Sequence, residues 1–398
     1  MIDQPSIEPG ATLGVWGGGQ LGMMFVQAAS AMGYRTAVYS PDPNAPACAH
    51  ADMVYCGDYE DIEQVWRFAK ACDVTTLEFE DVPVTTLQWA SAYTLVRPGI
   101  NVLKYTQNRA LEKQFLLDNH LPCVPHVVLE SVMGLHTAVK QIGIPCVLKT
   151  VTNGYDGHGQ YAIHHPGQVH GCWQKMGRQQ LICEQWIDHQ CELSVLVARS
   201  AGGQMVTFGP IVNEHHNHVL DISSVPGDLH PSVTRQATAL AEQVALSLDL
   251  VGIIAVEMYL LPDNRLLINE IAPRPHNSGH LTLQATDASQ FQQQVRAICN
   301  LPLMPMQQEQ PAVMVNIMGD LWEFGEPDFQ QLRDLPNVHL HLYGKIQARP
   351  GRKMGHITCL AESVQAARQL ALEARRKLRK TRPKSTHDDS RQEQLQTS

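Results

Sequence analysis

The sequence predicts an α/β protein with more than one domain, and three observations support this prediction. The chain has 398 residues, enough for two or three domains with cores of their own. It opens with a strand, a glycine-rich loop, a helix and a second strand, a pattern typical of parallel sheets. A hairpin pattern at residues 251–271 indicates antiparallel structure near the middle. We therefore expect α/β architecture with α+β character in the central lobe.

The composition is ordinary for a globular protein and argues against several functional classes. Apolar residues make up 44% and charged residues 17%, and the net charge of −9 disfavours a nucleic-acid partner. No apolar run has the length of a membrane span, and the first residues lack the apolar core of a signal peptide. The ten cysteines include no Cys-x-x-Cys pair, which is typical of reduced thiols. We expect a cytoplasmic protein without a membrane partner.

The expected first domain, residues 1–105, is Rossmann-like. An apolar run at 12–16 leads into Gly-Gly-Gly-Gln-Leu-Gly at 17–22, a helix to Met32 and a strand at 34–39. Glycines let the backbone and the helix N-terminus approach an anion. The Gly-x-Gly-x-x-Gly spacing also raises an NAD-linked oxidoreductase, although the acid expected after the second strand is missing. That alternative stays open.

Acidic residues follow another apolar run in this first domain. Residues 74–79 alternate in polarity, and Glu78 and Glu80 stand at the end of the run. Carboxylates at a strand end either face solvent or contact a polar substrate. Both interpretations stay open.

The next region, residues 106–302, has the features of a nucleotide site. A helix at 108–120 carries Arg109 and Lys113 on one side, and a strand at 144–149 ends in Lys149. The glycine-rich residues 153–160 can wrap phosphates with backbone N–H groups, with Lys149 as a point charge. A surface hairpin is an equally good interpretation of that loop taken alone.

Polar residues on the following strands extend this pattern. Strands at 181–187 and 192–197 bring Glu184 and Glu192 to positions suited to an adenine edge and a ribose. For the histidines at 215, 216 and 218 we favour exposure to solvent or a place beside the nucleotide over a metal site, because no partner motif accompanies them. A helix at 232–248 then leads into the hairpin.

The hairpin at residues 251–271 predicts a metal site. If its turn centres on Asp263 and Asn264, Glu257 lies opposite Glu270. Two opposed carboxylates repel, and Mg²⁺ between them removes the conflict. Arg274, in the proline-containing loop that follows, indicates a rigid anion site. The alternative is a slipped register with one carboxylate in solvent.

The C-terminal region, residues 303–380, begins within a Pro/Gln-rich linker at 301–311. Strands are expected at 312–318 and 338–343 and a basic amphipathic helix with a solvated face at 361–379. Between them, Lys345, Arg352 and Lys353 form either a phosphate site or an exposed basic turn. Residues 381–398 have too few apolar residues to form an ordered structure, which predicts a disordered tail.

Five strings in this chain match one family. They are TLEFEDVP at 76–83, NGYDGHGQ at 153–160, NEIAPRPHNSGH at 269–280, RPGRKMGH at 349–356 and the glycine loop above. Together, over residues 12–360, they resemble the ATP-grasp family of 5-(carboxyamino)imidazole ribonucleotide synthases. The resemblance implies a three-domain ATP-grasp fold. It also implies a reaction, the carboxylation of 5-aminoimidazole ribonucleotide with ATP and bicarbonate through carboxyphosphate. The expected metal is Mg²⁺ (or Mn²⁺), and the expected assembly is a homodimer.

The same resemblance implies roles for individual residues. For ATP these are Arg109, Lys149, Gly154, Tyr155, Asp156, Gly157, His158, Gly159, Gln160, Glu184, Glu192, His216 and Asn269. For the ribonucleotide they are Gln20, Leu21, Glu78, Asn277, Lys345, Arg352 and Lys353. The metal ligands are Glu257 and Glu270, and Arg274, Tyr155 and Lys345 are expected to serve the chemistry.

Three departures from the family pattern accompany this resemblance. Met23 stands where the family usually has an arginine, and Asn213-Glu214 stands where Glu-Asn is common. In an ideal hairpin Asn269 also faces away from Glu270. The related formate-dependent glycinamide ribonucleotide transformylase is the alternative within the fold, and a catalytically silent nucleotide-binding protein is a third.

Overall fold

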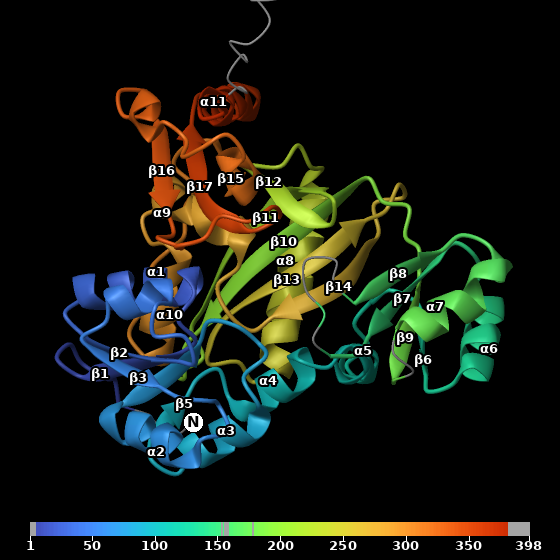
Figure 1. Ribbon diagram of the computed structural model, residues 1–398, viewed down its shortest axis with the longest axis horizontal. Coiled ribbons are helices and arrows are strands. Elements are labelled where there is room, and N and C mark those ends of the chain that lie inside the picture. Colours follow the sequence, from blue (N-terminus) through green and yellow to red (C-terminus); the bar gives the residue numbers. More distant parts are fainter. Residues whose placement is uncertain (1–4, 153, 155–158, 177–178, 381–398) are drawn as a thin grey trace, which may run out of the picture.

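The computed structural model describes residues 5–152, 154, 159–176 and 179–380, which form three β-sheets with flanking helices (Figure 1). The expected loop residues Tyr155, Asp156, Gly157 and His158 and the expected tail at 381–398 lie outside this description. Among the helices described, none is long and apolar enough to cross a membrane.

The first sheet has five parallel strands in the order β3-β2-β1-β4-β5 and confirms the α/β prediction. Its strands are β1 (Thr12–Trp16), β2 (Arg35–Ser40), β3 (Met53–Cys56), β4 (Val74–Leu77) and β5 (Leu95–Val96). Its helices are α1 (Gln20–Ala31), η1 (Pro46–Ala49), α2 (Ile62–Ala71), α3 (Val84–Ala90) and α4 (Ile100–Thr106). The alternation expected at 74–79 is wrong for β4, whose four residues are all buried, because helices cover both faces of this sheet.

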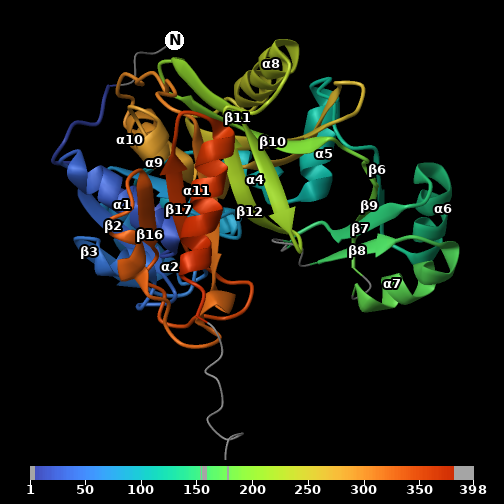
Figure 2. The same ribbon diagram turned by 90° about the horizontal axis from the view of Figure 1, so that it is seen from above.

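The second sheet has four antiparallel strands in the order β6-β9-β7-β8. Its strands are β6 (His126–Leu129), β7 (Cys146–Thr150), β8 (Gln160–Ile163) and β9 (Leu181–Gln185). Helices α6 (Val132–Ile142) and α7 (Val169–Lys175), with the short η2 (Pro166–Gln168) before α7, pack on one face (Figure 2). Because side chains alternate along a strand, Lys149 and Glu184 point to the opposite face.

The third sheet joins the central and C-terminal parts of the chain. Its eight antiparallel strands follow the order β14-β13-β10-β11-β12-β15-β17-β16, with β14 nearest the second sheet (Figure 1). They are β10 (Cys191–Arg199), β11 (Met205–His216), β12 (Val219–Val225), β13 (Gly252–Leu260), β14 (Leu266–Ala272), β15 (Ala312–Met318), β16 (Val338–Leu342) and β17 (Lys353–Leu360). Pairing of β12 with β15 carries this sheet across residue 303.

Helices cover this large sheet and connect it to the other two. They are α5 (Arg109–Asp118), α8 (Pro231–Ser247), η3 (Asn277–Leu281), α9 (Thr282–Ala285), α10 (Gln290–Ile298), η4 (Gly319–Trp322), η5 (Phe329–Leu332) and α11 (Val364–Lys377). Helix α11 buries Ala367, Ala371 and Ala374 against β15 and β17. Its basic face is not simply solvated as expected, since Arg368 and Arg375 bind Glu214 and Asp221.

The register of the β13–β14 hairpin agrees with the prediction at the glutamates but not near the turn. Leu260 pairs with Leu266 and Met258 with Ile268, one residue away from the predicted register, whereas Glu257 pairs with Glu270. The register shifts between Glu257 and Met258, so Asn269 is an extra residue, a β-bulge. The expected opposition of the two carboxylates is therefore restored by the bulge.

Candidate active site

A cavity of about 1060 Å³ lies where the three sheets meet. The residues expected at the site that line it are Gln20, Leu21, Glu78, Arg109, Lys149, Gln160, Glu192, Glu257, Asn269, Glu270, Arg274, Asn277, Lys345, Arg352 and Lys353. Gly154, Gly159, Glu184 and His216 are not among its lining residues. The fold thus brings together side chains separated by more than three hundred residues.

Each of the two opposed carboxylates already has a cationic or donor partner. Arg109 Nη1 lies 2.7 Å from Glu270 Oε2, and His276 Nε2 lies 3.0 Å from Glu257 Oε1. His276 Nδ1 accepts the Ser278 backbone N–H at 3.4 Å, so Nε2 is the nitrogen that carries a proton toward Glu257. Burial alone would raise the pKa of Glu257, but His276, His215 and Arg274 outweigh it and lower the pKa to about 2. Glu257 is therefore ionised and accepting.

In an ideal strand Asn269 and Glu270 would face opposite sides of the sheet, and the bulge explains how both can reach one cavity. A bulge re-aims side chains, and here both residues line the cavity. Asn269 Oδ1 is buried and has no hydrogen-bond partner among the described residues. A buried acceptor without a partner is rare in folded proteins, so Asn269 Oδ1 is a candidate for binding a ligand.

Glu184 lies behind the cavity wall and holds the ammonium group that lines it. Glu184 Oε2 is 2.5 Å from Lys149 Nζ, and Lys113 Nζ is 3.7 Å from Oε1. Burial would raise the pKa of Glu184, but Lys149 and Lys113 together lower it to about 2. In this structure Glu184 orients Lys149, and the direct nucleotide contact expected from the resemblance stays a prediction.

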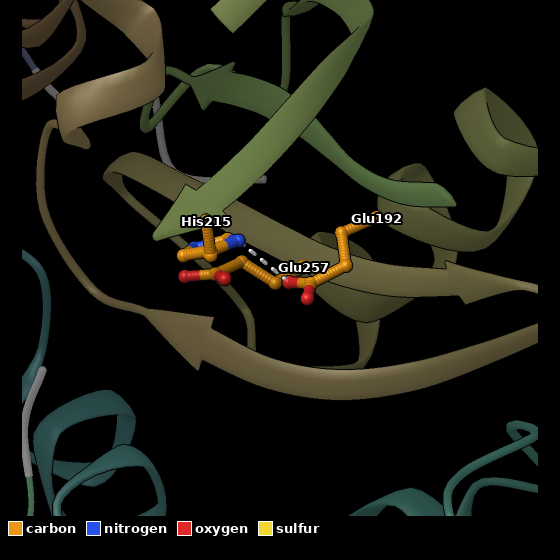
Figure 3. Close-up of side chains that lie close together, drawn as sticks. All are labelled: Glu192, His215 and Glu257. Atoms are coloured by element: carbon orange, nitrogen blue, oxygen red, sulfur yellow. Dashed lines mark ion pairs between the residues drawn. The ribbon is translucent and has the colours of Figure 1, made fainter. Parts of the chain in front are cut away.

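Of the histidines at 215, 216 and 218, His215 and His218 line the cavity, whereas His216 was expected. His215 Nδ1 lies 3.1 Å from Glu192 Oε2, and Figure 3 shows both side chains beside Glu257. One ligand atom from each of the three lies within 4.8 Å of the others. Burial lowers the pKa of His215 but the bond to Glu192 more than offsets it, so the pKa is raised. Alternation along β11, where Ile211 and Asn213 are buried, is the signal that points to the odd-numbered histidine.

Glu78 lines the cavity, but its carboxylate is bound to the glycine loop. Its Oε2 accepts the Gly22 N–H at 2.7 Å, and its Oε1 accepts the Gly19 N–H. A Cβ at Gly17, which has a φ of +109°, would overlap the Glu78 side chain. The Glu78 carboxylate therefore caps the start of α1, and its expected contact with the substrate stays a prediction. Because it accepts N–H groups at the N-terminus of α1, those groups are not available to an anion such as a dinucleotide phosphate, which disfavours the NAD interpretation of this loop.

Glu80 is a partner of Arg274, which neither open interpretation anticipated. Arg274 Nε donates to Glu80 Oε2 at 2.6 Å, and Nη2 donates to Oε1 at 2.8 Å. Burial would raise the pKa of Glu80, but Arg274 outweighs it and lowers the pKa. A bidentate clamp fixes the guanidinium plane at the cavity wall.

One group of the residues that line the cavity is basic. This basic cluster consists of Lys345, Arg349, Arg352 and Lys353, from β17 and the loop that precedes β17. Lys345 Nζ donates to the Lys353 carbonyl at 2.8 Å. Asn277 lies beside them and exchanges hydrogen bonds with Asn316. Several cations suit a phosphate group.

Family comparisons agree with this geometry. Three family profiles match: a ribonucleotide synthetase preATP-grasp domain at residues 10–107, an ATP-grasp domain at 114–291 and a phosphoribosylaminoimidazole carboxylase C-terminal domain at 312–370. An N5-carboxyaminoimidazole ribonucleotide synthase of Bacillus subtilis is 39% identical over 356 residues, which are 89% of this chain and 93% of the relative. The chain belongs to the N5-carboxyaminoimidazole ribonucleotide synthase family.

Solved structures of this family have the same architecture. N5-carboxyaminoimidazole synthetase from Staphylococcus aureus complexed with ADP is 30% identical, with a TM-score of 0.89 over 94% of this chain and 100% of the other. N5-carboxyaminoimidazole synthase from Aspergillus clavatus in complex with ADP and 5-aminoimidazole ribonucleotide is 28% identical, with a TM-score of 0.84 over 92% and 99%. The ATP-grasp fold and the family expected from the five strings are confirmed.

Proposed function

We propose that this cavity couples ATP cleavage to carboxylation of 5-aminoimidazole ribonucleotide, the reaction of its family. The enzyme is an ATP-grasp carbon–nitrogen ligase of purine biosynthesis. The assignment of residues rests on one observation, that acidic and basic side chains line the same cavity. Its lining combines the opposed carboxylates, a basic cluster and Arg274.

The opposed carboxylates fit Mg²⁺. Glu257 and Glu270 face each other, and the partnerless Asn269 Oδ1 lies in the same wall. Hard divalent cations prefer carboxylate and amide oxygens, and Mn²⁺ accepts the same donors. Bound there, the cation would neutralise phosphate charge during phosphoryl transfer.

The nucleotide takes the adjoining wall. Lys149 supplies a fixed positive charge, Arg109 donates to the Gly154 carbonyl at 3.1 Å, and Gln160 lines the cavity. Glu192 and His215 form a polar pair that suits ribose hydroxyls, so we assign His215 the nucleotide contact expected of His216. The role of Tyr155 stays a hypothesis of shielding or proton handling.

The ribonucleotide phosphate binds at the basic cluster. Lys345, Arg352 and Lys353 belong to it, with Asn277 nearby and Gln20 and Leu21 at the start of α1. Held there, the substrate extends its amine toward Arg274, because phosphate contacts at one end orient the rest of a small ligand.

The reaction follows from these positions. A bicarbonate oxygen attacks the γ-phosphorus, the bond to ADP breaks, and carboxyphosphate forms. Lys149 and Arg274 offset the developing negative charge. The amine nitrogen then bonds to the carboxyl carbon, either directly or after CO₂ release, while phosphate leaves and the amine loses a proton. Exclusion of water protects the reactive carboxyphosphate.

Three coarser features complete the proposal. We propose domains at 1–105, 106–302 and 303–380, with a tail after them, and a homodimer, as the family resemblance implies. A cytoplasmic setting is consistent with the described cysteines, all of which are free thiols.

ADP release by the purified protein tests the proposal. We expect release with Mg-ATP and bicarbonate to depend on 5-aminoimidazole ribonucleotide, because the amine completes the turnover. Glycinamide ribonucleotide with formate is the matched alternative pair. Release driven by that pair, or release independent of bicarbonate, would contradict the proposed substrates.

A further inference from the structure

Helix α5 lies along the outer edge of β14, the strand that carries Asn269 and Glu270 (Figure 1). An edge strand leaves a row of main-chain N–H and C=O groups without ladder partners. Arg109, Glu112 and Lys113 stand at i, i+3 and i+4 of α5 and therefore share one face of it.

That face and the segment after α5 together satisfy the edge of β14. Ile268 exchanges main-chain hydrogen bonds with Pro122 and Val124. Beyond Ile268 the bulge begins, and two side chains of α5 take the place of a neighbouring strand. Lys113 Nζ donates to the Asn269 carbonyl, and Glu112 Oε2 accepts the Ile271 N–H at 2.9 Å.

Both of these titratable side chains are almost completely buried. Glu112 and Lys113 are each 1% exposed, and Glu112 Oε1 has no hydrogen-bond partner among the described residues. Buried ionic groups are often no more stabilising than apolar residues of the same size. Stability alone therefore explains this pair poorly.

Lys113 also connects the bulge to the opposite wall of the cavity. Its ammonium group lies 3.7 Å from Glu184 Oε1, and Glu184 Oε2 holds Lys149. One buried lysine thus contacts the main chain of the bulge and the carboxylate that orients Lys149. Removal of its charge affects both walls together.

We propose that Glu112 and Lys113 are positioning residues that hold the Asn269 bulge, and through it aim Asn269 and Glu270 at the divalent cation. The proposal rests on the proposed function, because it takes Glu270 as a ligand. Neither side chain lines the cavity, so both act through β14.

The test is Mn²⁺ affinity of the ADP complex, measured by electron paramagnetic resonance. We expect Lys113→Met to weaken Mn²⁺ binding by about tenfold or more, as for other outer-shell partners of metal ligands. The matched control is Arg199→Met. Arg199 also donates to a main-chain carbonyl, that of Leu250. It is the last residue of β10 and does not line the cavity. Arg199→Met should leave Mn²⁺ affinity unchanged.

Glu112 supplies a second pair of variants if Lys113→Met does not fold. Glu112→Gln keeps an acceptor for Ile271 N–H, whereas Glu112→Leu removes it. We expect weakened Mn²⁺ binding and faster amide exchange at Ile271 in Glu112→Leu, with both effects largely restored in Glu112→Gln.

Unchanged Mn²⁺ affinity in folded Lys113→Met and Glu112→Leu would overturn the proposal. Glu270→Gln separates this failure from failure of the proposed function. If Glu270→Gln loses Mn²⁺ while Lys113→Met keeps it, only the positioning role is wrong. If Glu270→Gln also keeps Mn²⁺, the metal assignment itself is wrong.

Discussion

The glycine loop before α1 and the β13–β14 hairpin both bring carboxylates to the same cavity, but they differ in what satisfies those carboxylates. At the loop, the Glu78 carboxylate accepts two backbone N–H groups of its own domain. At the hairpin, Glu257 and Glu270 pair instead with the side chains of His276 and Arg109. The comparison teaches that a glycine-rich motif can serve the local fold, whereas an opposed pair of carboxylates is the candidate ligand site.

The largest expected effect is at the hairpin. Glu270→Gln keeps the shape and a hydrogen-bond acceptor but removes the charge, so we expect ADP formation to fall by about a thousandfold or more. Steady-state turnover measures this, with far-ultraviolet circular dichroism to show retention of the fold. Glu373→Gln, exposed on α11, is the matched control. Near-normal turnover would refute the role given to Glu270.

The next effect concerns acid stability and Glu184. Its pKa of about 2, against an ordinary 4.5, means that the ionised form is favoured in the folded state. This contribution, about 3 kcal/mol, is present above pH 4.5 and is lost as the pH falls toward 2. Glu184→Gln should lower the free energy of unfolding at pH 7 and flatten its decline below pH 4.5 in urea titrations. If the free energy of unfolding of Glu184→Gln declined below pH 4.5 as it does in the wild type, the ion pairs of Glu184 would be contradicted.

A smaller loss is expected at the glycine loop. Glu78→Ala leaves the N–H groups of Gly19 and Gly22 without their acceptor, so the free energy of unfolding should fall by about 2 kcal/mol. Urea denaturation measures it, and Asp61→Ala, which removes an exposed N-cap of α2, provides the comparison. If Glu78→Ala were fully stable but failed to bind the ribonucleotide, Glu78 would belong with the ligands after all.

The smallest effect is expected at the basic cluster. Lys345→Ala removes one of several cations there, so we expect the KM for the ribonucleotide to rise by about tenfold while that for ATP stays nearly constant. Initial rates at varied concentrations of each substrate give both constants from one preparation. Equal rises in both would remove Lys345 from the phosphate site.

Local sequence patterns predicted elements whose signals lie close together in the chain. The β1–loop–α1 opening and the helix at Arg109 follow from glycines, apolar periodicity and the Asn108 N-cap. The pairing of Glu257 with Glu270 was predicted correctly, but for an incomplete reason. Its bulge depends on Glu112 and Lys113, more than 150 residues away in the sequence, and no pattern in the hairpin reveals them.

Three other features of the site depend on contacts between distant segments. Glu78 meets the glycine loop, and Glu80 meets Arg274, only when the fold is complete. Glu184 was expected at the nucleotide because its strand ends in polar groups. In the structure it forms ion pairs with two buried lysines from other elements.

The central claim is that the opposed carboxylates of β13 and β14 hold the divalent cation, and calorimetric titration of Mg²⁺ into the ADP complex tests it most directly. We predict one saturable binding event in the wild-type enzyme. In Glu257→Gln and Glu270→Gln the affinity should fall by about tenfold or more, and in the double variant binding should be lost. Unaltered Mg²⁺ affinity in the folded double variant would contradict the account.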